Sequence, residues 1–427
     1  RYGLVMPGGS RIVFEGYDVP PKMRAFHAGL IGVDALIVLD EAHLVPPFTK
    51  LLQSIQNDPS LWPEDRALLP PFIVLPLSAT QRAGTKPENG RISFGLADED
   101  WHDETAAQRL NAHKQLRVEP LAEKEQDRQF AEAAFALATQ HGPARVAVFC
   151  NRRERKDDGS GPSAQGVAET IAELAKENKK TGREKTDIHP VELLVGARRV
   201  FERDQVACRL KKLGFIGSGG PSDKPAFLVA TSAGEVGVDI DADHMVCDLV
   251  EWERMVQRLG RVNRRGRAGH EAQVVVFDTS SIEKDEQRSA RLAVGRNLLS
   301  RIETDLGGKT GPAALLELRR RVDPQEIGRG STPEPLHPSL TRALADAWSM
   351  TSLERHAGRP EVAPWLRGWE EKTPPQTTVV WRTYLPVREG VSDWPLTPSQ
   401  KKEVDDFFEA AEPRESERHR PPFSGRV

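Results

Sequence analysis

Two acidic residues directly follow a short apolar run near the start of the 427-residue chain. The run Ala35–Leu39 leads into Asp40 and Glu41, and Ala42 and His43 complete the tetrapeptide DEAH. If this run is a parallel strand, both carboxylates lie beyond its carboxyl end, where open α/β sheets bind ligands. One carboxylate can hold a Mg²⁺ ion that bridges phosphates, while its neighbour orients or deprotonates the attacking water. We therefore predict that Asp40 anchors magnesium and Glu41 activates water; a turn with solvated acids also explains the tetrapeptide alone.

A second apolar run, residues 72–77, ends in hydroxyl side chains. Ser78 and Thr80 flank Ala79, so both hydroxyls should lie at the same edge of the sheet as the acidic pair. Serine and threonine are ordinary turn residues, so this segment indicates a functional site only in company with the acidic strand.

A third run, Ala226–Ala230, is followed by small and polar residues, among them Thr231, Ser232, Gly237 and Asp239. Small residues let a backbone approach a phosphate closely, and hydroxyls and amides can hold a nucleic-acid backbone without reading its bases. Asp239 could accept a hydrogen bond from a ribose hydroxyl. A structural turn explains this segment alone equally well.

The segment 251–267 carries six arginines in a helical pattern. Apolar residues at i, i+4 and i+7 form a stripe that would dock the helix on the sheet: Met255, Leu259 and Val262. Polar residues follow the same spacing on the other side: Gln257, Arg261 and Arg264. Guanidinium groups bind phosphate oxygens, so we predict that Arg261 and Arg264 neutralise charge on a nucleotide, whereas Arg265 and Arg267 fit a solvated face or a general nucleic-acid patch.

These segments need a common scaffold. Seven short apolar runs alternate with turns and helical patterns: residues 35–39, 72–77, 145–149, 191–195, 226–230, 245–250 and 272–277. Continuous apolar runs indicate strands buried on both faces, and helical patterns at 127–139, 164–176 and 201–213 lie between them. We therefore predict an α/β fold of doubly wound parallel sheets, followed by a mostly helical C-terminal region. Composition places the domains at residues 1–120, 121–280 and 281–411, with a disordered tail at 412–427.

Overall composition excludes several classes of protein. Lys and Arg number 60 against 63 Asp and Glu, and this near balance excludes a uniformly basic nucleic-acid coat. No apolar run reaches the roughly 20 residues that span a bilayer. The three cysteines form no CxxC pair and no disulfide framework, so we expect a cytoplasmic protein without a membrane partner.

Four segments, taken in chain order, resemble motifs II, III, V and VI of superfamily two helicases: DEAH, SAT, TSAGEVGVD and QRLGRVNRRGR. In that superfamily the ATP site lies between two RecA-like domains. Residues 23–48 and 230–266 are more closely similar to the CRISPR-associated helicase-nucleases of type I systems, above all the I-G (formerly I-U) subtype. The resemblance covers about residues 9 to 280 and, more loosely, an accessory segment at 362–382.

This resemblance implies ATP-driven 3′ to 5′ translocation on single-stranded DNA by a monomer that an RNA-guided CRISPR surveillance complex recruits. It implies a nucleotide and Mg²⁺ site formed by Asp40, Glu41, Gly237, Asp239, Arg261 and Arg264. It implies nucleic-acid contacts from Ser78, Thr80, Arg198, Thr231 and Ser232. His43 and Gln257 would link the state of the nucleotide to domain closure.

The sequence departs from this family in two ways. Residues 1–30 contain no GxxxxGK[ST] phosphate-binding loop, and the only GK[ST] tripeptide, Gly308-Lys309-Thr310, fits a helix end. The only His-Asp dipeptide, His102-Asp103, lies in a polar segment and fits the surface better than a nuclease site. We therefore expect a complete protein in which the phosphate-binding loop precedes this chain and a metal-dependent nuclease domain follows it, and no ATP hydrolysis by the chain alone.

Two alternatives remain open at the level of sequence. One is a DExH helicase that acts on RNA or in DNA repair, and the other is a nucleic-acid binding module without ATPase activity. The tryptophans at 365, 369, 381 and 394 fit core anchors better than a stacking platform for bases.

Overall fold

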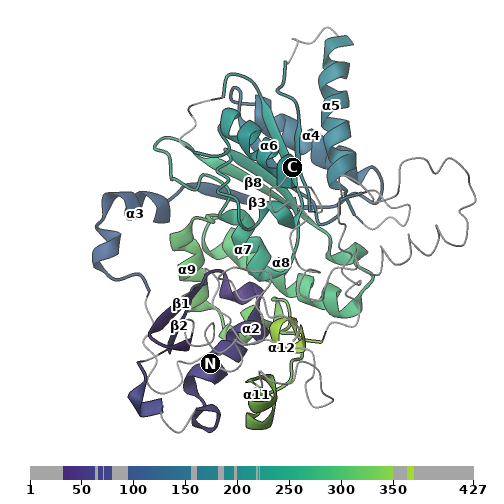
Figure 1. Cartoon of the computed structure of the whole chain (residues 1–427). Helices are drawn as coiled ribbons and strands as arrows, with labels where there is room; N and C mark the ends of the chain where they lie inside the picture. Colours follow the sequence, from purple (N-terminus) through teal and green to yellow (C-terminus); the bar gives the residue numbers. More distant parts are fainter. Residues whose placement is uncertain are drawn as a thin grey trace, which may run out of the picture. The chain divides into compact units, whose positions relative to one another are not determined.

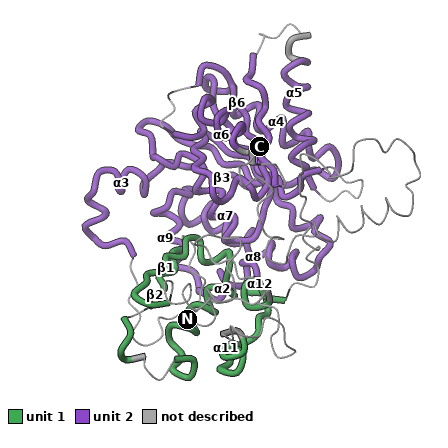
Figure 2. The backbone as a smooth tube through the Cα atoms, in the orientation of Figure 1, with its two compact units in different colours: residues 1–79, 334–427 green, residues 80–333 purple. Residues whose placement is uncertain are grey.

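The computed structural model describes residues 32–62, 66–70, 72–78, 95–154, 161–180, 187–196, 200–217, 220, 222–349 and 363–369. These residues belong to two compact units (Figure 2). Unit 1 combines residues 1–79 with 334–427, and unit 2 comprises residues 80–333. The division into domains expected from composition stays a prediction.

Unit 2 is built on a six-stranded parallel sheet with the strand order β3-β8-β7-β4-β6-β5 (Figure 1). Its strands are β3 (Lys114–Pro120), β4 (Arg145–Phe149), β5 (Glu192–Leu194), β6 (Ala226–Ala230), β7 (His244–Asp248) and β8 (Ala272–Asp278). Every residue of β4, β6 and β7 is buried, as continuous apolar runs predict for central parallel strands.

Helices cover both faces of this sheet. In β6, Phe227 and Val229 pack in a core with α4 (Gln126–Thr139) and α5 (Ala164–Lys180), whereas Leu228 belongs to the core on the opposite face. That second core includes side chains of α6 (Val200–Lys212), α7 (Trp252–Leu259) and α8 (Glu286–Asp305). The predicted doubly wound α/β fold is therefore confirmed for unit 2.

The strand β3 is one that the apolar pattern missed. Its sequence KQLRVEP alternates charged and apolar residues, and it lies at the edge of the sheet, where it pairs with β8 alone. An edge strand needs no continuous apolar run, because only part of its surface is buried. The polar sequence before residue 125 therefore contains β3, which is preceded by the short helix α3 (Glu104–Leu110).

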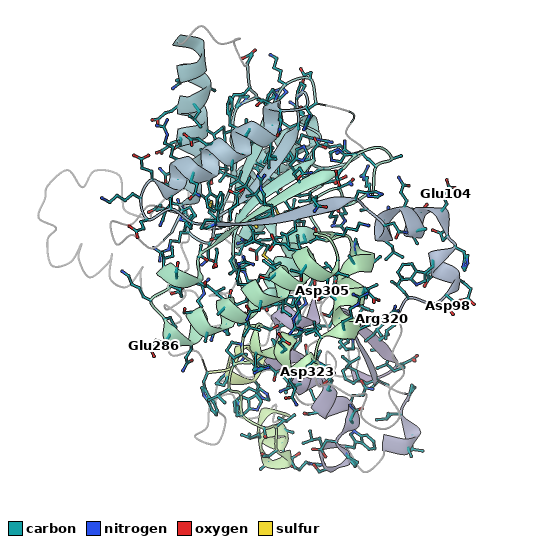
Figure 3. The ribbon with its side chains drawn as sticks, turned by 180° about the vertical axis from the view of Figure 1, so that it is seen from behind. Asp98, Glu104, Glu286, Asp305, Arg320 and Asp323 are labelled. Atoms are coloured by element: carbon teal, nitrogen blue, oxygen red, sulfur yellow. The ribbon has the colours of Figure 1, made fainter. Side chains whose placement is uncertain are left out.

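The part of unit 2 beyond the sheet is helical. It consists of α8, whose end residues Glu286 and Asp305 are labelled in Figure 3, α9 (Pro312–Arg321) and α10 (Pro324–Arg329). Asp285 accepts a hydrogen bond from the backbone N–H of Arg288 and so caps the start of α8. The described C-terminal region is thus mostly helical, as predicted, with no regular structure at residues 331–341.

Unit 1 contains a two-stranded parallel sheet of β1 (Ala35–Leu39) and β2 (Phe72–Pro76). The amphipathic helix α2 (Pro46–Asn57) buries Leu51, Leu52 and Ile55 in a core with residues of both strands. The same unit includes α11 (Arg342–Ser349) and α12 (Ala363–Arg367), and Trp365 of α12 is buried in that core. Trp365 is thus a core anchor, whereas Trp369 is 59% exposed and the other two tryptophans fall outside the described residues.

No helix in the described part of the chain is long and apolar enough to cross a bilayer.

Candidate functional site

The carboxyl ends of β1 and β2 are held together by backbone hydrogen bonds. Leu77 N–H donates to Leu39 O, and Ala42 N–H donates to Leu77 O, each at 2.9 Å. Asp40 and Glu41 follow β1 at this edge, where the parallel register predicted them. Asp40 is exposed, and its Oδ1 accepts the backbone N–H of Glu41 at 2.9 Å.

The backbone at Glu41 adopts an unusual conformation. Its φ of 50° lies in the left-handed region, which is uncommon for a residue with a Cβ atom. Such conformations cluster at sites where the surrounding structure holds a side chain in a required direction.

His43 contacts both neighbouring segments of this edge. Its Nδ1 lies 3.0 Å from Ser78 Oγ, at the end of β2, and 3.3 Å from Glu41 Oε2. The His43 side chain is only 5% exposed, so the burial of the ring fixes its position. The structure therefore brings together three of the predicted residues, Glu41, His43 and Ser78. Thr80 lies outside the described residues.

Glu41 Oε2 is buried and, beyond the 3.3 Å approach of His43 Nδ1, has no hydrogen-bond partner among the described residues. A carboxylate oxygen in this state has free lone pairs for a water molecule or a hard cation. Among the described residues no group of three or more His, Cys, Asp or Glu side chains could hold a metal ion by itself. Two adjacent carboxylates still fit Mg²⁺, because this ion usually takes one or two protein carboxylates and fills its other positions with phosphate and water oxygens.

In unit 2, the segment after β6 turns sharply at the carboxyl end of the sheet. Thr231 is buried, and its N–H donates to Leu194 O at 3.1 Å, whereas Ser232 is exposed at the start of a short 3₁₀ turn. Gly237 is exposed and has a φ of 79°, a conformation that glycine adopts without strain. Arg198, the weaker candidate for a nucleic-acid contact, lies outside the described residues.

The helical pattern predicted for 251–267 is correct only in its first half. Met255, Leu259 and Val262 are all fully buried, which confirms the apolar stripe. However, α7 ends at Leu259, and the next residues form a turn in which Ala242 N–H donates to Arg261 O at 2.9 Å. Gly260 favours this ending because glycine disfavours a helix, and the pairing with residue 242 then claims the backbone. The prediction that Gln257, Arg261 and Arg264 share one helical face was therefore wrong.

The turn nevertheless places the two predicted arginines close to the segment after β6. Arg261 is 6% exposed, and its Nε and Nη2 both donate to Glu235 O, at 2.9 and 2.5 Å. Arg264 is half-exposed, and its Nη1 lies 3.0 Å from Asp239 Oδ1. Two residues predicted for the nucleotide site, Asp239 and Arg264, thus form an ion pair.

Gln257 is buried on α7, and its Nε2 has no hydrogen-bond acceptor among the described residues. A buried amide donor without an acceptor is costly, so its hydrogen bond is available to a ligand such as a phosphate oxygen.

Sequence reasoning missed the most deeply buried charge of this region. Arg258 is fully buried, donates to Glu235 and Asp248, and stacks over the Phe149 ring at 5.4 Å. Burial by itself would lower the pKa of Arg258, but the two carboxylates outweigh it and raise the pKa well above its ordinary value. For Glu235, burial would raise the pKa, and Arg258 and Arg254 instead hold it below its ordinary value. A fully buried arginine inside an arginine run has no distinct sequence signal, because only the fold shows which one faces the core.

Two short sequence matches have structural roles. Gly308, Lys309 and Thr310 follow the end of α8, and the backbone pairs with β3: Leu116 N–H donates to Gly308 O at 2.8 Å, and Thr310 N–H to Lys114 O at 3.0 Å. This geometry confirms the helix-end interpretation.

The His-Asp pair lies at the surface, as expected. Asp103 caps α3 by accepting the N–H of Ala106 at 2.7 Å, and His102 Nδ1 lies 2.9 Å from Asp98 O. Asp98 and Glu104, labelled in Figure 3, mark this segment.

Comparison with known proteins finds similarity over part of this chain. Residues 164–267, which include the segments after β6 and around α7, match the family model of the C-terminal region of the CRISPR-associated nuclease/helicase Cas3. A curated relative from Myxococcus xanthus, described as a CRISPR-associated nuclease/helicase Cas3, is 31% identical over 134 residues, which are 29% of this chain and 18% of that protein.

Solved structures of T. fusca Cas3 are also similar. One has a TM-score of 0.49 and 15% sequence identity, and the match covers 77% of this chain and 40% of that chain. A second, described as T. fusca Cas3 with ATP, has a TM-score of 0.45 and 17% identity, with 80% and 42% of the two chains covered. The chain thus spans less than half the length of each of these relatives. By the family-model match and the curated relative, this part of the chain is similar to CRISPR-associated Cas3 nuclease/helicases.

Proposed function

We propose that this chain forms the motor of an ATP-dependent helicase that moves 3′ to 5′ on single-stranded DNA in a type I CRISPR antiviral system. The proposal is supported by the similarity of residues 164–267 to the C-terminal region of Cas3 and by the order of the motifs along the chain. A metal-dependent nuclease domain outside this chain would cut the strand that the motor delivers. An RNA-guided surveillance complex would recruit the protein to an already opened target.

The observation that carries the proposal is the contact of His43 with Ser78 and Glu41. Glu41 is the residue proposed to activate water, and Ser78 is proposed to couple the site to DNA. A buried imidazole between them gives the two functions a common physical element. A shift of Ser78 caused by the nucleic acid would move the ring and with it the environment of the Glu41 carboxylate.

The nucleotide would bind as its Mg²⁺ complex. The nucleotide would supply the phosphoryl group, and the ion would supply the positive charge that holds the phosphate oxygens. Asp40 would anchor the ion, and Glu41 Oε2, beside His43, would orient a water molecule for in-line attack. Within unit 2, Gln257 can donate its Nε2–H to a phosphate oxygen, and Arg264 can exchange Asp239 for phosphate. Gly237 leaves room for the close approach of the nucleotide.

Nucleic-acid contacts are proposed for the hydroxyl groups that end the strands and for one basic residue. Ser232 is exposed and Thr231 borders it, so this turn can donate hydrogen bonds to backbone phosphates without selecting bases. Ser78, Thr80 and Arg198 are proposed as the further contacts. A motor that translocates should avoid base-specific contacts, because they would stop it at particular sequences.

The substrate is tested by the stimulation of ATP hydrolysis in the complete protein. We expect single-stranded DNA to stimulate hydrolysis strongly and RNA of the same sequence to stimulate it little. Unwinding should require a 3′ single-stranded overhang, and CRISPR genes should neighbour the reading frame. Equal or stronger stimulation by RNA, or unwinding that requires a 5′ overhang, would contradict the proposal.

A further inference from the structure

Three neighbouring strands of the unit 2 sheet end at an open pocket. Asn151, Asp248 and Thr279 line this pocket, and they lie at or just beyond the carboxyl ends of β4, β7 and β8. Its volume, including the part that is open to solvent, is about 470 Å³. No residue of its lining belongs to the predicted nucleotide or nucleic-acid sites, so the proposed function gives this pocket no role.

The pocket lies where the path of the chain through the sheet reverses. After β4 the chain passes through α5 to β5 on one side, and after β7 it passes through α7 to β8 on the other side. Helix α5 packs in the core on one face of the sheet, and α7 packs in the core on the opposite face. Open α/β sheets bind ligands in the crevice that such diverging connections leave beyond the strand ends. The topology therefore predicts a ligand at the ends of β4 and β7.

The carboxylate oxygens at this pocket already have donors from the protein. Both oxygens of Asp248 and both oxygens of Glu283 accept hydrogen bonds, two from arginine side chains and two from backbone N–H groups. The distances are 2.6, 2.7, 2.6 and 3.2 Å. The two acids are thus engaged in holding the protein together, and the pocket has little need of a cation.

Two donor groups at the pocket, in contrast, lack an acceptor. Arg254 Nη1 donates to the Asn151 side chain at 2.9 Å, and because a guanidinium group can only donate, the accepting atom must be Oδ1. The other end of this amide is therefore Nδ2, which has no acceptor in the described part of the chain. Arg288 uses Nε for Glu251 and Nη1 for Glu283, and its Nη2 likewise has no acceptor among the described residues. An occupant of this pocket must accept hydrogen bonds.

The charges of the lining favour an anion. Arg152, Lys284 and Arg288 line the pocket together with two carboxylates, Asp248 and Glu283, so positive groups outnumber negative ones. Guanidinium and ammonium groups are the usual protein partners of phosphate oxygens. Unused donors and an excess of positive charge together fit a phosphate group.

The pocket is also adjacent to the turn that is proposed to contact nucleic acid. Cys150 N–H donates to Ala230 O at 2.9 Å, so the carboxyl ends of β4 and β6 are held side by side. Thr231 and Ser232 directly follow β6. Neighbouring strands lie about 4.8 Å apart, so one nucleic-acid strand can reach both this turn and the pocket.

On the basis of the proposed function, we propose that this pocket holds a backbone phosphate of the nucleic acid that the Thr231–Ser232 turn contacts. Asn151 Nδ2 and Arg288 Nη2 donate to the phosphate oxygens, and Arg152 and Lys284 add positive charge. Such a contact fixes the position of the strand without reading its bases, as a translocating motor requires.

The test replaces the donor of Asn151 by an acceptor of the same size. In Asn151→Asp, one carboxylate oxygen still accepts from Arg254, whereas the other takes the place of Nδ2 and repels a phosphate. The affinity of the complete protein for a single-stranded oligothymidylate is measured by fluorescence anisotropy, without nucleotide and in a buffer free of phosphate. We expect Kd to rise roughly tenfold to a hundredfold, which corresponds to one hydrogen bond to a charged group. Gln205→Glu makes the same change at an exposed position of α6 and should leave Kd within about twofold of the parent.

The outcomes separate this inference from the proposed function. If the parent protein binds no single-stranded nucleic acid, the proposed function fails and the inference fails with it. If the parent binds RNA better than DNA and Asn151→Asp weakens both, the phosphate site stands and only the preference for DNA is wrong. Equal DNA affinity of Asn151→Asp and the parent overturns the inference. If inorganic phosphate then raises the Tm of the parent but not that of the variant, the pocket binds free phosphate and not nucleic acid.

A second variant keeps the test decisive if Asn151→Asp does not fold. Lys284 is exposed, so Lys284→Gln removes a positive charge of the lining at little cost to the fold. We expect Kd to rise about two- to fivefold, and the slope of log Kd against log salt concentration to fall by about 0.7, the value for one phosphate contact on a single strand. Lys212→Gln, at an exposed position of α6, should change neither quantity. An unchanged Kd and slope in Lys284→Gln would contradict the inference.

Discussion

Ser78 Oγ lies 3.0 Å from His43 Nδ1, and the same nitrogen lies 3.3 Å from Glu41 Oε2. Residues 35 positions apart in sequence meet because β1 and β2 are parallel neighbours and end at the same edge. The acidic motif and the serine that follows the next apolar run are thus parts of one arrangement.

Removing the hydroxyl of Ser78 should uncouple ATP hydrolysis from strand unwinding. In Ser78→Ala, the imidazole of His43 loses its contact with the end of β2 but keeps its position beside Glu41. We expect ATP hydrolysis without DNA to change less than about threefold, and strand unwinding to fall by at least about tenfold, because only coupling depends on this contact. Ser60→Ala, at an exposed position of the same unit, is the control. Unwinding at the parental rate would show that the contact does not couple the two activities.

Arg258 should be essential for the stability of unit 2. Its replacement by methionine leaves the carboxylates of Glu235 and Asp248 buried without their shared partner. Breaking such a buried pair costs about 3–5 kcal/mol, and we expect a loss of this size in the free energy of unfolding measured with urea. Arg128→Met, which breaks an exposed ion pair, should cost no more than about 0.5 kcal/mol. A loss of unfolding free energy below about 1 kcal/mol in Arg258→Met would contradict the stabilising role of the buried ion pairs with Glu235 and Asp248.

His244 predicts a loss of stability in mild acid. Burial, followed by the neighbouring His270 and His141, lowers the pKa of His244 to about 4, below its ordinary value of 6.5. The unfolded chain therefore binds more protons than the folded chain between these two pH values. Stability from this group is fully present above about pH 6.5 and falls by on the order of 3 kcal/mol as the pH drops to about 4.

The variant His244→Asn tests this assignment, because an amide oxygen can replace Nδ1 as the acceptor of Gln273 N–H. Urea unfolding at a series of pH values should show a weaker dependence between pH 6.5 and 4 in the variant than in the parent. His102→Asn controls for the removal of a surface histidine. The same slope in His244→Asn and the parent would rule out His244 as the source.

The tripeptide Gly308-Lys309-Thr310 should matter for stability and not for nucleotide binding. Gly308 has a φ of 77°, and a Cβ atom there would lie 3.2 Å from Leu116 O and closer still to the Gln115 side chain. Gly308→Ala should therefore lower the free energy of unfolding by about 1–2 kcal/mol. Lys309→Ala should leave nucleotide affinity of the complete protein unchanged in an equilibrium titration. A tenfold or larger loss of affinity would mean that this lysine binds phosphate.

The buried strands of this fold could be predicted from sequence. The runs at Arg145–Phe149 and Ala226–Ala230 form buried strands with those same bounds, because a central parallel strand must be apolar on both faces. The run at Ala35–Leu39 also forms a strand with the predicted bounds, but its residues are half-buried or exposed, so the expected burial on both faces is wrong there. The edge strand β3 could not be found in this way, because its charged residues face solvent or the ends of neighbouring segments. The helical periodicity also predicted a helix that continues beyond Leu259, where α7 ends. The bridge between Ala242 and Val262 that replaces the helix there is a tertiary contact without a local sequence signal.

The residues of the candidate site could be predicted where a short sequence motif contains the reactive side chains. They could not be predicted where the role of a residue depends on how deeply its side chain is buried. Asp40, Glu41 and His43 stand out by type and position, and the structure adds the contact with Ser78. Arg261 and Arg258 are chemically alike and only three residues apart. One points its guanidinium at a carbonyl and the other sits fully buried between carboxylates, a difference that depends on where the helix ends. Glu235 was overlooked because a carboxylate in a glycine-containing turn resembles a solvated residue.

The central claim, that Glu41 activates the water that attacks a bound nucleotide, is tested most directly by Glu41→Gln in the complete protein. The amide keeps the size of the side chain but cannot accept a proton, so ATP affinity should stay within about threefold of the parent. DNA-stimulated hydrolysis should fall on the order of 10²–10⁴-fold, the usual contribution of a general base. Glu132→Gln provides the matched surface control. Hydrolysis by Glu41→Gln at the parental rate would contradict the account.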